Sequence, residues 1–424
     1  MSWQILVSIL IICAAIYAIV KKCDARLTLF LAGAIMCLLA GSPMDAFKGF
    51  VKGMVNPNLV PPICVAMGFA AAVTYSKCDQ HLVALLATPL RKIGGLLIFA
   101  GIFTTFLVNI AIMSAAGTAA TVGATFIPIM IRAGIRPAGA AAAIGGGTMM
   151  GLLLNPGCAH DIYIAKLGNT PVMEFISNNA IYIVATMLVA AIVSTLVMIF
   201  FFKDNKPEAA ELAEFVSEEK EGEFKINLAK ATAPLVPMVL LICGTLWLPK
   251  GSLDVVASML LGVAYIAIIS FRHPNELIKS FFKGMGSGYA SVIGLIIAAG
   301  VFALGMQKIG LVPAFIDLLK ESNDIARWGA SFGPFLLAVL TGSGEAAIWA
   351  FNQAVTPHAA SFGMNPETLG LLCAIAGQLG RTASPIAGCI IIVAGIAKVS
   401  PVEISKRMCV GMLVALVFAA LIMV

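Results

Sequence analysis

The sequence predicts an all-α polytopic membrane protein, and three observations support this fold class. Only 11% of the 424 residues are charged and 60% are hydrophobic, whereas about 25% of the residues of an ordinary soluble domain are charged. Mean hydropathy is +1.00. The apolar runs are long enough to cross a bilayer as helices, which satisfy their own backbone groups, and they lack the short alternating pattern of a membrane barrel. A single-domain soluble enzyme is therefore excluded.

A transmembrane helix needs about 20 apolar residues, and this length predicts about 12 transmembrane helices. We expect them near residues 3–20, 27–41, 58–76, 93–112, 138–154, 175–202, 231–249, 253–271, 287–308, 327–341, 366–380 with a continuation at 386–398, and 405–424.

One long hydrophilic stretch divides the chain into three predicted parts. Residues 1–202 form the first half, 203–230 a polar linker, and 231–424 the second half. The linker carries Glu208, Glu211, Glu214, Glu218, Glu219, Glu221 and Glu223. The net charge of +6 comes from Lys and Arg in short loops, which is typical of membrane proteins and does not indicate nucleic acid. The cysteines are scattered through apolar stretches without a CxxC pair, so we interpret them as small core residues.

The two halves resemble each other, which indicates an internal duplication. Phe47–Met54 is similar to Ile278–Met285, and the later matches keep a nearly constant separation. They pair Gly117, Pro128, Gly134, Pro137 and Asn155-Pro156 with Gly344, Pro357, Gly363, Pro366 and Ser384-Pro385. One extra helix precedes each repeat unit, so the units are parallel or inverted depending on the number of crossings. Both arrangements occur in transporters and place the substrate site at the interface of the repeats, so the duplication favours a transporter.

Each unit contains a segment too small and polar for contact with lipid. These segments are Ser114–Thr121 and Thr341–Ala347. We expect each to form a re-entrant hairpin whose tip faces a hydrated cavity, with close packing of small residues between helices as the alternative. The candidate substrate-binding residues on the tips are Ser114, Thr118, Thr341 and Ser343.

The next predicted helix of each unit is interrupted by a polar block containing proline. The blocks are Asn155–Asp161 and Gln378–Pro385. Proline disfavours helix at and before its own position, and the half-helix ends at such a break can bind ions. The candidate substrate-binding residues here are Asn155, Arg381, Thr382 and Ser384.

Four ionisable residues lie in these polar segments: His160, Asp161, Glu345 and Arg381. Charges at membrane depth are costly and normally have a partner or a role. The planar guanidinium of Arg381 suits a carboxylate, with a structural pair to Glu345 or Asp161 as the alternative. Glu345 and Asp161 are the candidates for ion coupling, and exposure at a membrane face is the alternative for His160 and Asp161. HExxH, GxSxG and Walker motifs are absent, so we expect no enzyme and no resident cofactor.

At the second break the sequence resembles the anaerobic four-carbon dicarboxylate transporters of the DcuC type. Gly380–Gly388 and Ala394–Glu403 carry the resemblance, together with Thr341–Gly344 and, in the first half, Phe126–Pro128. The similarity covers most of the chain. The chain departs from the family pattern at Glu345, where the family has a neutral residue, and in the stretch from Asn155 to His160.

This resemblance implies a member of the ion-transporter superfamily, in which a domain carrying hairpins and broken helices moves against a scaffold. It implies uptake, exchange or efflux of fumarate, succinate and related dicarboxylates across a bacterial inner membrane, coupled to Na⁺ or H⁺ or run as an exchange. The expected partners are the substrate and the lipid bilayer, without nucleic acid, and a homodimer is the assembly to test. A carrier of another organic anion or an amino acid is the alternative, and a non-transporting scaffold or intramembrane enzyme is the rival from another class.

Overall fold

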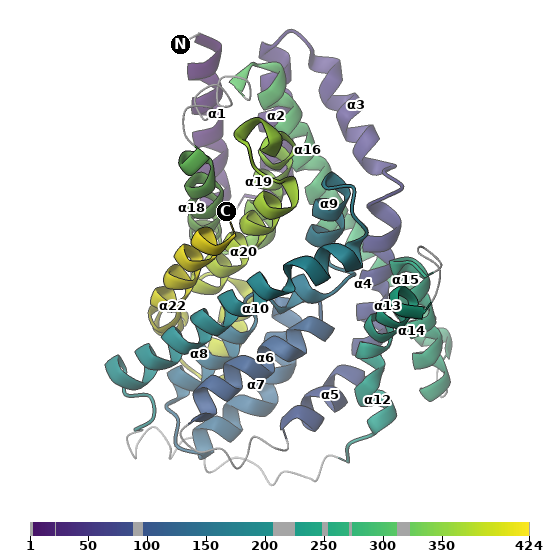
Figure 1. The fold of residues 1–424 in the computed structure, drawn as a ribbon, viewed down its shortest axis with the longest axis vertical. Helices are drawn as coiled ribbons and strands as arrows, with labels where there is room; N and C mark the ends of the chain where they lie inside the picture. The colour runs from purple at the N-terminus through teal and green to yellow at the C-terminus, as the bar shows by residue number, and fades with distance from the viewer. Residues whose placement is uncertain are drawn as a thin grey trace.

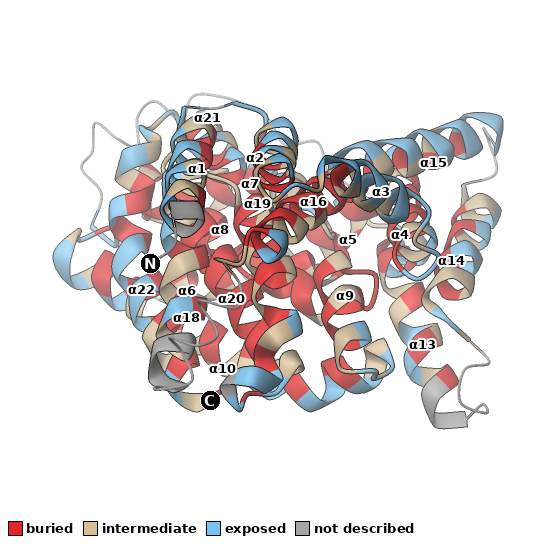
Figure 2. Cartoon of the chain, turned by 90° about the horizontal axis from the view of Figure 1, so that it is seen from above, coloured by how far each residue is buried: buried red, intermediate tan, exposed pale blue. Residues whose placement is uncertain are grey.

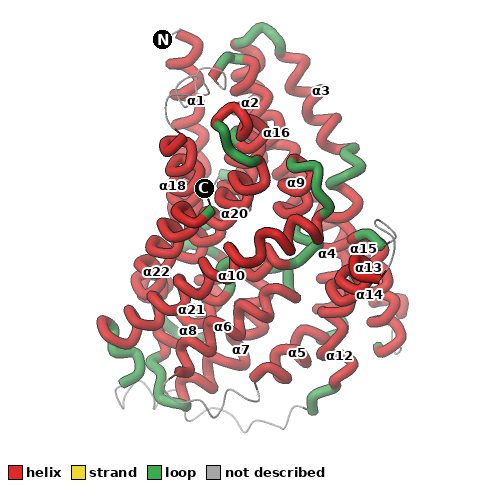
Figure 3. Tube along the Cα trace, in the orientation of Figure 1, coloured by secondary structure: helices red, strands yellow, loops and turns green. Residues whose placement is uncertain are grey.

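The structure is a computed structural model, and the part of the chain that it describes is built from helices and connecting loops, without strands (Figure 3). The described residues are 3–21, 23–87, 96–206, 225–247, 253–270, 274–311 and 323–423. The glutamates of the predicted polar linker lie outside these ranges.

The first half forms a series of helices that begins at one end of the elongated molecule (Figure 1). They are α1 (Trp3–Val20), α2 (Ala25–Leu39), α3 (Pro43–Met54), α4 (Val60–Tyr75), α5 (Cys78–Ala87), α6 (Leu97–Ala111), α7 (Ala115–Arg132), α8 (Pro137–Gly147), the 3-10 turn η3 (Gly151–Leu154), α9 (Ala159–Leu167), α10 (Val172–Leu196) and the π-helical η4 (Val197–Phe201).

The second half repeats much of this order. Its elements are α12 (Leu228–Thr232), η5 (Ala233–Leu235), α13 (Val236–Trp247), α14 (Val255–Ile269), α15 (Pro274–Gly288), η6 (Tyr289–Ile293), α16 (Gly294–Lys308), α18 (Asn323–Thr341), α19 (Gly344–Ala354), η7 (Thr356–Phe362), α20 (Pro366–Ala383), α21 (Gly388–Ile396) and α22 (Pro401–Ile422).

The repetition extends to single backbone conformations. Gly134 and Gly363 precede α8 and α20, and both have positive φ. Asn169 precedes α10 and Lys398 precedes α22, and these two non-glycine residues also have positive φ, at 56° and 53°. A left-handed conformation is uncommon outside glycine, so its recurrence at matched positions is independent evidence for two copies of one unit.

The buried side chains form two principal cores. The main core joins α6–α8 and α10 to α18 and α20–α22, with Phe106, Phe126, Phe175, Leu371 and Leu416 among its residues. The second core joins α1, α2, α4 and α16, with Leu29, Met36, Ile63 and Ile297 among its residues. Figure 2 shows the buried residues gathered around α20 in the middle of the molecule.

Two short helices lie on the border between these cores. α9 gives Ile164 to the main core and Ile162 to the second core. In the same way α19 gives Ile348 to the main core and Trp349 to the second. Each of these two helices therefore contacts both cores.

Six described helices are long and apolar enough to cross a membrane: α7, α8 with α9, α10 with η4, α15 with α16, α20 with α21, and α22. Shorter apolar helices include α1, α2, α4, α6, α14 and the Leu228–Gly244 segment. The count of about 12 crossings therefore stays a prediction. Sequence reasoning missed α3 and α5 as helices, and it began the span of α16 at residue 287, although α15, η6 and α16 run without interruption from Pro274 to Lys308.

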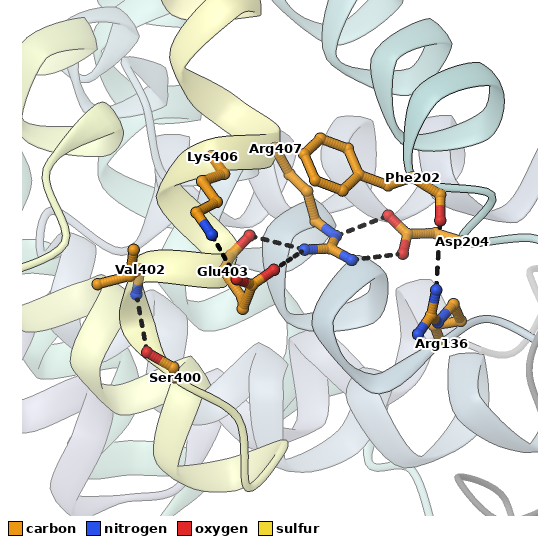
Figure 4. Close-up of polar contacts among 8 residues, drawn as sticks. All are labelled: Arg136, Phe202, Asp204, Ser400, Val402, Glu403, Lys406 and Arg407. Carbon is orange, nitrogen blue, oxygen red and sulfur yellow. Dashed lines mark hydrogen bonds and ion pairs between the residues drawn. The ribbon is translucent and has the colours of Figure 1, made fainter.

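A buried ion pair fastens the end of the first half to the last helix of the second (Figure 4). Arg407 on α22 donates from Nε and Nη2 to the two carboxylate oxygens of Asp204, at 2.8 and 2.9 Å. The guanidinium lies 4.3 Å from the ring centroid of Phe202, and its Nη1 donates to Glu403. Arg136 donates to the carbonyl of Phe202, which adds the start of α8 to the cluster.

Candidate functional site

Each predicted hairpin is a break between two helices that is capped by a serine. In the first unit, Ser114 Oγ accepts the N–H of Gly117 at 3.1 Å and starts α7. In the second, Ser343 Oγ accepts the N–H of Ala346 at 3.2 Å and starts α19. Serine is a favoured N-cap because its side chain satisfies one of the free N–H groups of the first turn. The N-termini of α7 and α19 carry partial positive charge and suit an anionic group.

The helices continue differently after the two tips. α7 passes through Pro128 and ends at Arg132, whereas α19 ends at Ala354 before Pro357. In the second unit the chain continues as a 3-10 helix, whose start is held by a hydrogen bond from the hydroxyl of Thr356 to the side chain of Asn352. The proline thus marks the end of the helix only in the second unit.

The break in each broken helix is tied to the hairpin of its own unit. Asn155 Nδ2 donates to the carbonyl of Ile110 on α6 at 2.7 Å. Ser384 Oγ donates to the carbonyl of Val339 on α18, also at 2.7 Å. Donor and acceptor are separated by 45 residues in both units. Two different side chains at matched positions therefore make the same contact.

The predicted threonines turn their hydroxyls to nearby groups of the protein. Thr118 is buried and lies within hydrogen-bond distance of Asn109. Thr341 donates to the carbonyl of Leu337 at 2.7 Å, and its oxygen accepts the N–H of Ser343. Thr382, also buried, donates to the carbonyl of Gln378 at 2.9 Å. These hydroxyls shape the tips and the break, and in this conformation each has a partner within the protein.

Arg381 joins the two units. Its side chain is buried, and Nη2 donates to the carbonyls of Thr148 and Met149 at the end of α8, at 2.7 and 3.3 Å. Nε donates to Gln378 at 3.0 Å. Nη1 faces weaker acceptors, the Cys389 thiol at 2.9 Å and the Thr148 hydroxyl at 3.5 Å. The predicted alternative, a pair with Glu345 or Asp161, is not among these contacts.

A second contact between the units joins His160 to Glu345. His160 lies at the N-terminus of α9 and Glu345 in the first turn of α19, and Nε2 is 3.0 Å from Oε2. The imidazole is 1% exposed, whereas 45% of the glutamate side chain is exposed. His160 also packs against Trp349, with 4.8 Å between the ring centroids. Simple exposure of His160 at a membrane face, the alternative left open by the sequence, is wrong.

Asp161 is fully buried beside this pair. Neither of its carboxyl oxygens has a hydrogen-bond partner of ordinary geometry, and the Cys158 thiol is its polar neighbour. Exposure at a membrane face is therefore also wrong for Asp161. A buried carboxyl without a strong partner is a candidate for proton or cation binding.

Sequence reasoning missed three residues that complete this region. Thr148 follows a run of glycine and alanine, and nothing in the sequence indicated its contact with Arg381. The contact is made mainly by its backbone carbonyl, which does not depend on the type of side chain. Gln378 precedes Arg381 by one helical turn, a spacing that could have indicated contact. Trp349 follows Glu345 by four residues on α19, which places both on one side of the helix.

The chain is a membrane transporter with two repeat units, a class that its family and its fold identify. A solved structure, the Alcanivorax borkumensis YdaH transporter, has the same fold, with a TM-score of 0.63 at 15% identity over 96% of this chain and 97% of that one. The chain belongs to the DcuC family, whose model, described as a C4-dicarboxylate anaerobic carrier, matches residues 58–424. It is a multi-pass protein of the bacterial inner membrane.

Two proteins named as transporters are similar to this chain in sequence. The anaerobic C4-dicarboxylate transporter DcuC of Escherichia coli K12 is 28% identical over 98% of this chain and 95% of its own length. An uncharacterized transporter of Haemophilus influenzae is 41% identical over 281 residues, which are 64% of this chain and all of that one.

Proposed function

We propose that this protein is a secondary active transporter of four-carbon dicarboxylates such as fumarate and succinate. Membership of the DcuC family is the observation that carries the proposal. The capped N-termini of α7 and α19 and the guanidinium of Arg381 supply the positive electrostatic potential that a dianion needs. Transport is driven by a gradient of Na⁺ or H⁺ or proceeds by exchange.

One substrate carboxylate binds at the Nη1 edge of Arg381 in this proposal. The thiol of Cys389 and the distant hydroxyl of Thr148 are weak acceptors there, so a carboxylate that replaces them forms stronger, charge-assisted hydrogen bonds. Ser114 and Ser343, which start α7 and α19, bind the substrate from the hairpin tips. The remaining polar groups of the site are Thr118, Asn155, Thr341, Thr382 and Ser384.

We propose an alternating-access mechanism that is based on the two cores. The main core contains α7, α8, α20 and α21, the second core contains α1, α2, α4 and α16, and α9 and α19 contribute to both. We propose that the main core moves against the second and carries the substrate across the membrane, with Asp161 and Glu345 binding the coupling ion between them.

Counterflow in proteoliposomes tests the proposed function. Vesicles loaded with unlabelled succinate should accumulate labelled succinate or fumarate faster than empty vesicles, because a carrier exchanges the two. Protein-free vesicles are the control. Counterflow with an amino acid or another organic anion, but not with dicarboxylates, would replace the proposed substrate. Counterflow with no member of such a panel would contradict transport itself.

A further inference from the structure

The contact between His160 and Glu345 connects the first repeat unit to the second, and it lies where the main core meets the second core. His160 belongs to the first unit and Glu345 to the second. The helices that carry them, α9 and α19, are the ones that divide their side chains between the main and second cores. Tyr163 Oη, one turn along α9, also donates to the carbonyl of Asn352 on α19 at 3.5 Å. Movement of one core against the other would therefore alter the surroundings of this pair.

The two partners differ in their exposure at the surface of the protein. The imidazole is buried against Trp349. The rings of Trp349 and Tyr163 also pack edge to face, with 5.3 Å between their centroids. The side chain of Glu345 is almost half exposed and lies in the first turn of α19, beside its capped N-terminus. Any anion that approaches this N-terminus therefore meets the charge of Glu345.

The elements packed against α9 and α19 are α10, α16, α18, α20 and η7. Their acidic residues, basic residues and histidines are Glu174 on α10, Lys308 on α16, Asp324 and Arg327 on α18, Glu367 and Arg381 on α20, and His358 on η7. Arg381 acts electrostatically on Glu345, and α9 itself carries Asp161, Tyr163 and Lys166 after its N-cap, Cys158.

We propose that His160 and Glu345 together bind one proton, and that this proton is the ion transported with the substrate. With a neutral imidazole the pair carries one negative charge, which repels a dicarboxylate at the start of α19. Protonation of His160 neutralises the pair, so proton and substrate bind more tightly together than alone. An imidazole is suited to this role because its ordinary pKa lies close to neutral pH. Thermodynamic linkage makes the effect reciprocal.

This inference rests on the proposed transport of a dicarboxylate, and it predicts two measurements. Addition of fumarate to the purified protein in weakly buffered detergent should take up protons, which a pH-indicator dye reports. In proteoliposomes, the KM for fumarate should fall with falling pH by up to roughly tenfold per pH unit, the limit for one coupled proton. An inwardly directed H⁺ gradient should drive net accumulation.

Two variants isolate the pair. His160→Gln cannot take up the proton, so proton uptake with substrate should disappear and the KM should become independent of pH. Glu345→Gln removes the carboxylate that pairs with the buried imidazole, so His160 loses the charge that holds its proton. Proton uptake and the pH dependence should then also disappear, and this variant serves if His160→Gln does not fold. His358→Gln is the matched control, since His358 lies beyond the end of α19 beside α1 residues and should leave the pH dependence intact.

The outcomes separate this inference from the proposed function. Absence of dicarboxylate counterflow in the unmodified protein contradicts the proposed function. Dicarboxylate counterflow with a KM independent of pH, or with unchanged pH dependence and proton uptake in both Gln variants, contradicts only the proton-binding pair. Accumulation driven by Na⁺ without proton uptake would likewise show that another site carries the coupling ion.

Discussion

Replacing Arg381 by lysine tests how the two units are held together at the site. The guanidinium makes three close contacts to strong acceptors, the carbonyls of Thr148 and Met149 and the side chain of Gln378, at 2.7, 3.3 and 3.0 Å. A lysine ammonium on its flexible stem can keep one of these three contacts in this geometry. Two charge-assisted hydrogen bonds at roughly 1.5–3 kcal/mol each are then lost, so the variant should be less stable by about 3–6 kcal/mol.

Thermal unfolding of the purified protein in detergent, followed by tryptophan fluorescence, measures this loss, and counterflow gives the apparent affinity. We expect Arg381→Lys to lower the Tm and to raise the KM for succinate by about tenfold or more, because the bidentate geometry toward a carboxylate is also lost. Arg26→Lys is the matched control, since Arg26 forms an exposed pair with Asp24, and such pairs contribute about 0–1 kcal/mol. An unchanged Tm would refute the structural role of Arg381, and an unchanged KM would remove it from the substrate site.

Three further changes are predicted from the structure. Arg407→Met should lower the free energy of unfolding by about 3–5 kcal/mol, because it removes the guanidinium that binds both carboxylate oxygens of the buried Asp204. An unaltered Tm would contradict this. Burial raises the pKa of the Asp79 carboxyl above its usual range, so its ionised form costs stability above the unfolded-state pKa. Asp79→Asn should therefore raise the Tm at pH 8 but not at pH 4, and an equal shift at both pH values would refute the cause. Gly342→Ala should destabilise the second hairpin by at least about 1–2 kcal/mol and slow counterflow. The reason is that φ at Gly342 is +71° and an added Cβ would lie 2.8 Å from the backbone carbonyl oxygen of Ile386. Gly388→Ala is the control and should have neither effect, since an added Cβ there meets open space.

Much of the fold could be predicted from the sequence because hydropathy and proline positions are strong local signals. The ends of α1, α2 and α4 lie within a few residues of the predicted spans, and both polar blocks with proline interrupt their helices. The helices α3 and α15 were missed because each has polar and apolar faces and lacks a continuous apolar run. A search for long apolar runs depends on the length and mean hydropathy of a segment, and it does not detect the helical periodicity of an amphipathic helix.

The site was less predictable because its contacts join residues far apart in the chain. The sequence marked Arg381 and Glu345 as costly charges that need partners, and this expectation of partners is correct. It could not identify those partners, because the closest acceptor for Arg381 is a backbone carbonyl, which any residue type supplies. His160 was placed at a membrane face as readily as in the site, since a histidine next to an aspartate has no distinctive pattern.

The ion pair between Asp204, at the start of the polar linker, and Arg407 has a counterpart at the other end of the linker. The backbone N–H of Asn227 donates to His81 Nδ1 at 3.2 Å, and the ammonium of Lys230 lies 3.5 Å from the carbonyl of Ser76. The chain is thus anchored both where it leaves the first half and where it enters the second. A fluorescent protein or a protease site engineered between these anchors could report on assembly, and the halves could be produced as two polypeptides that recombine in the bilayer.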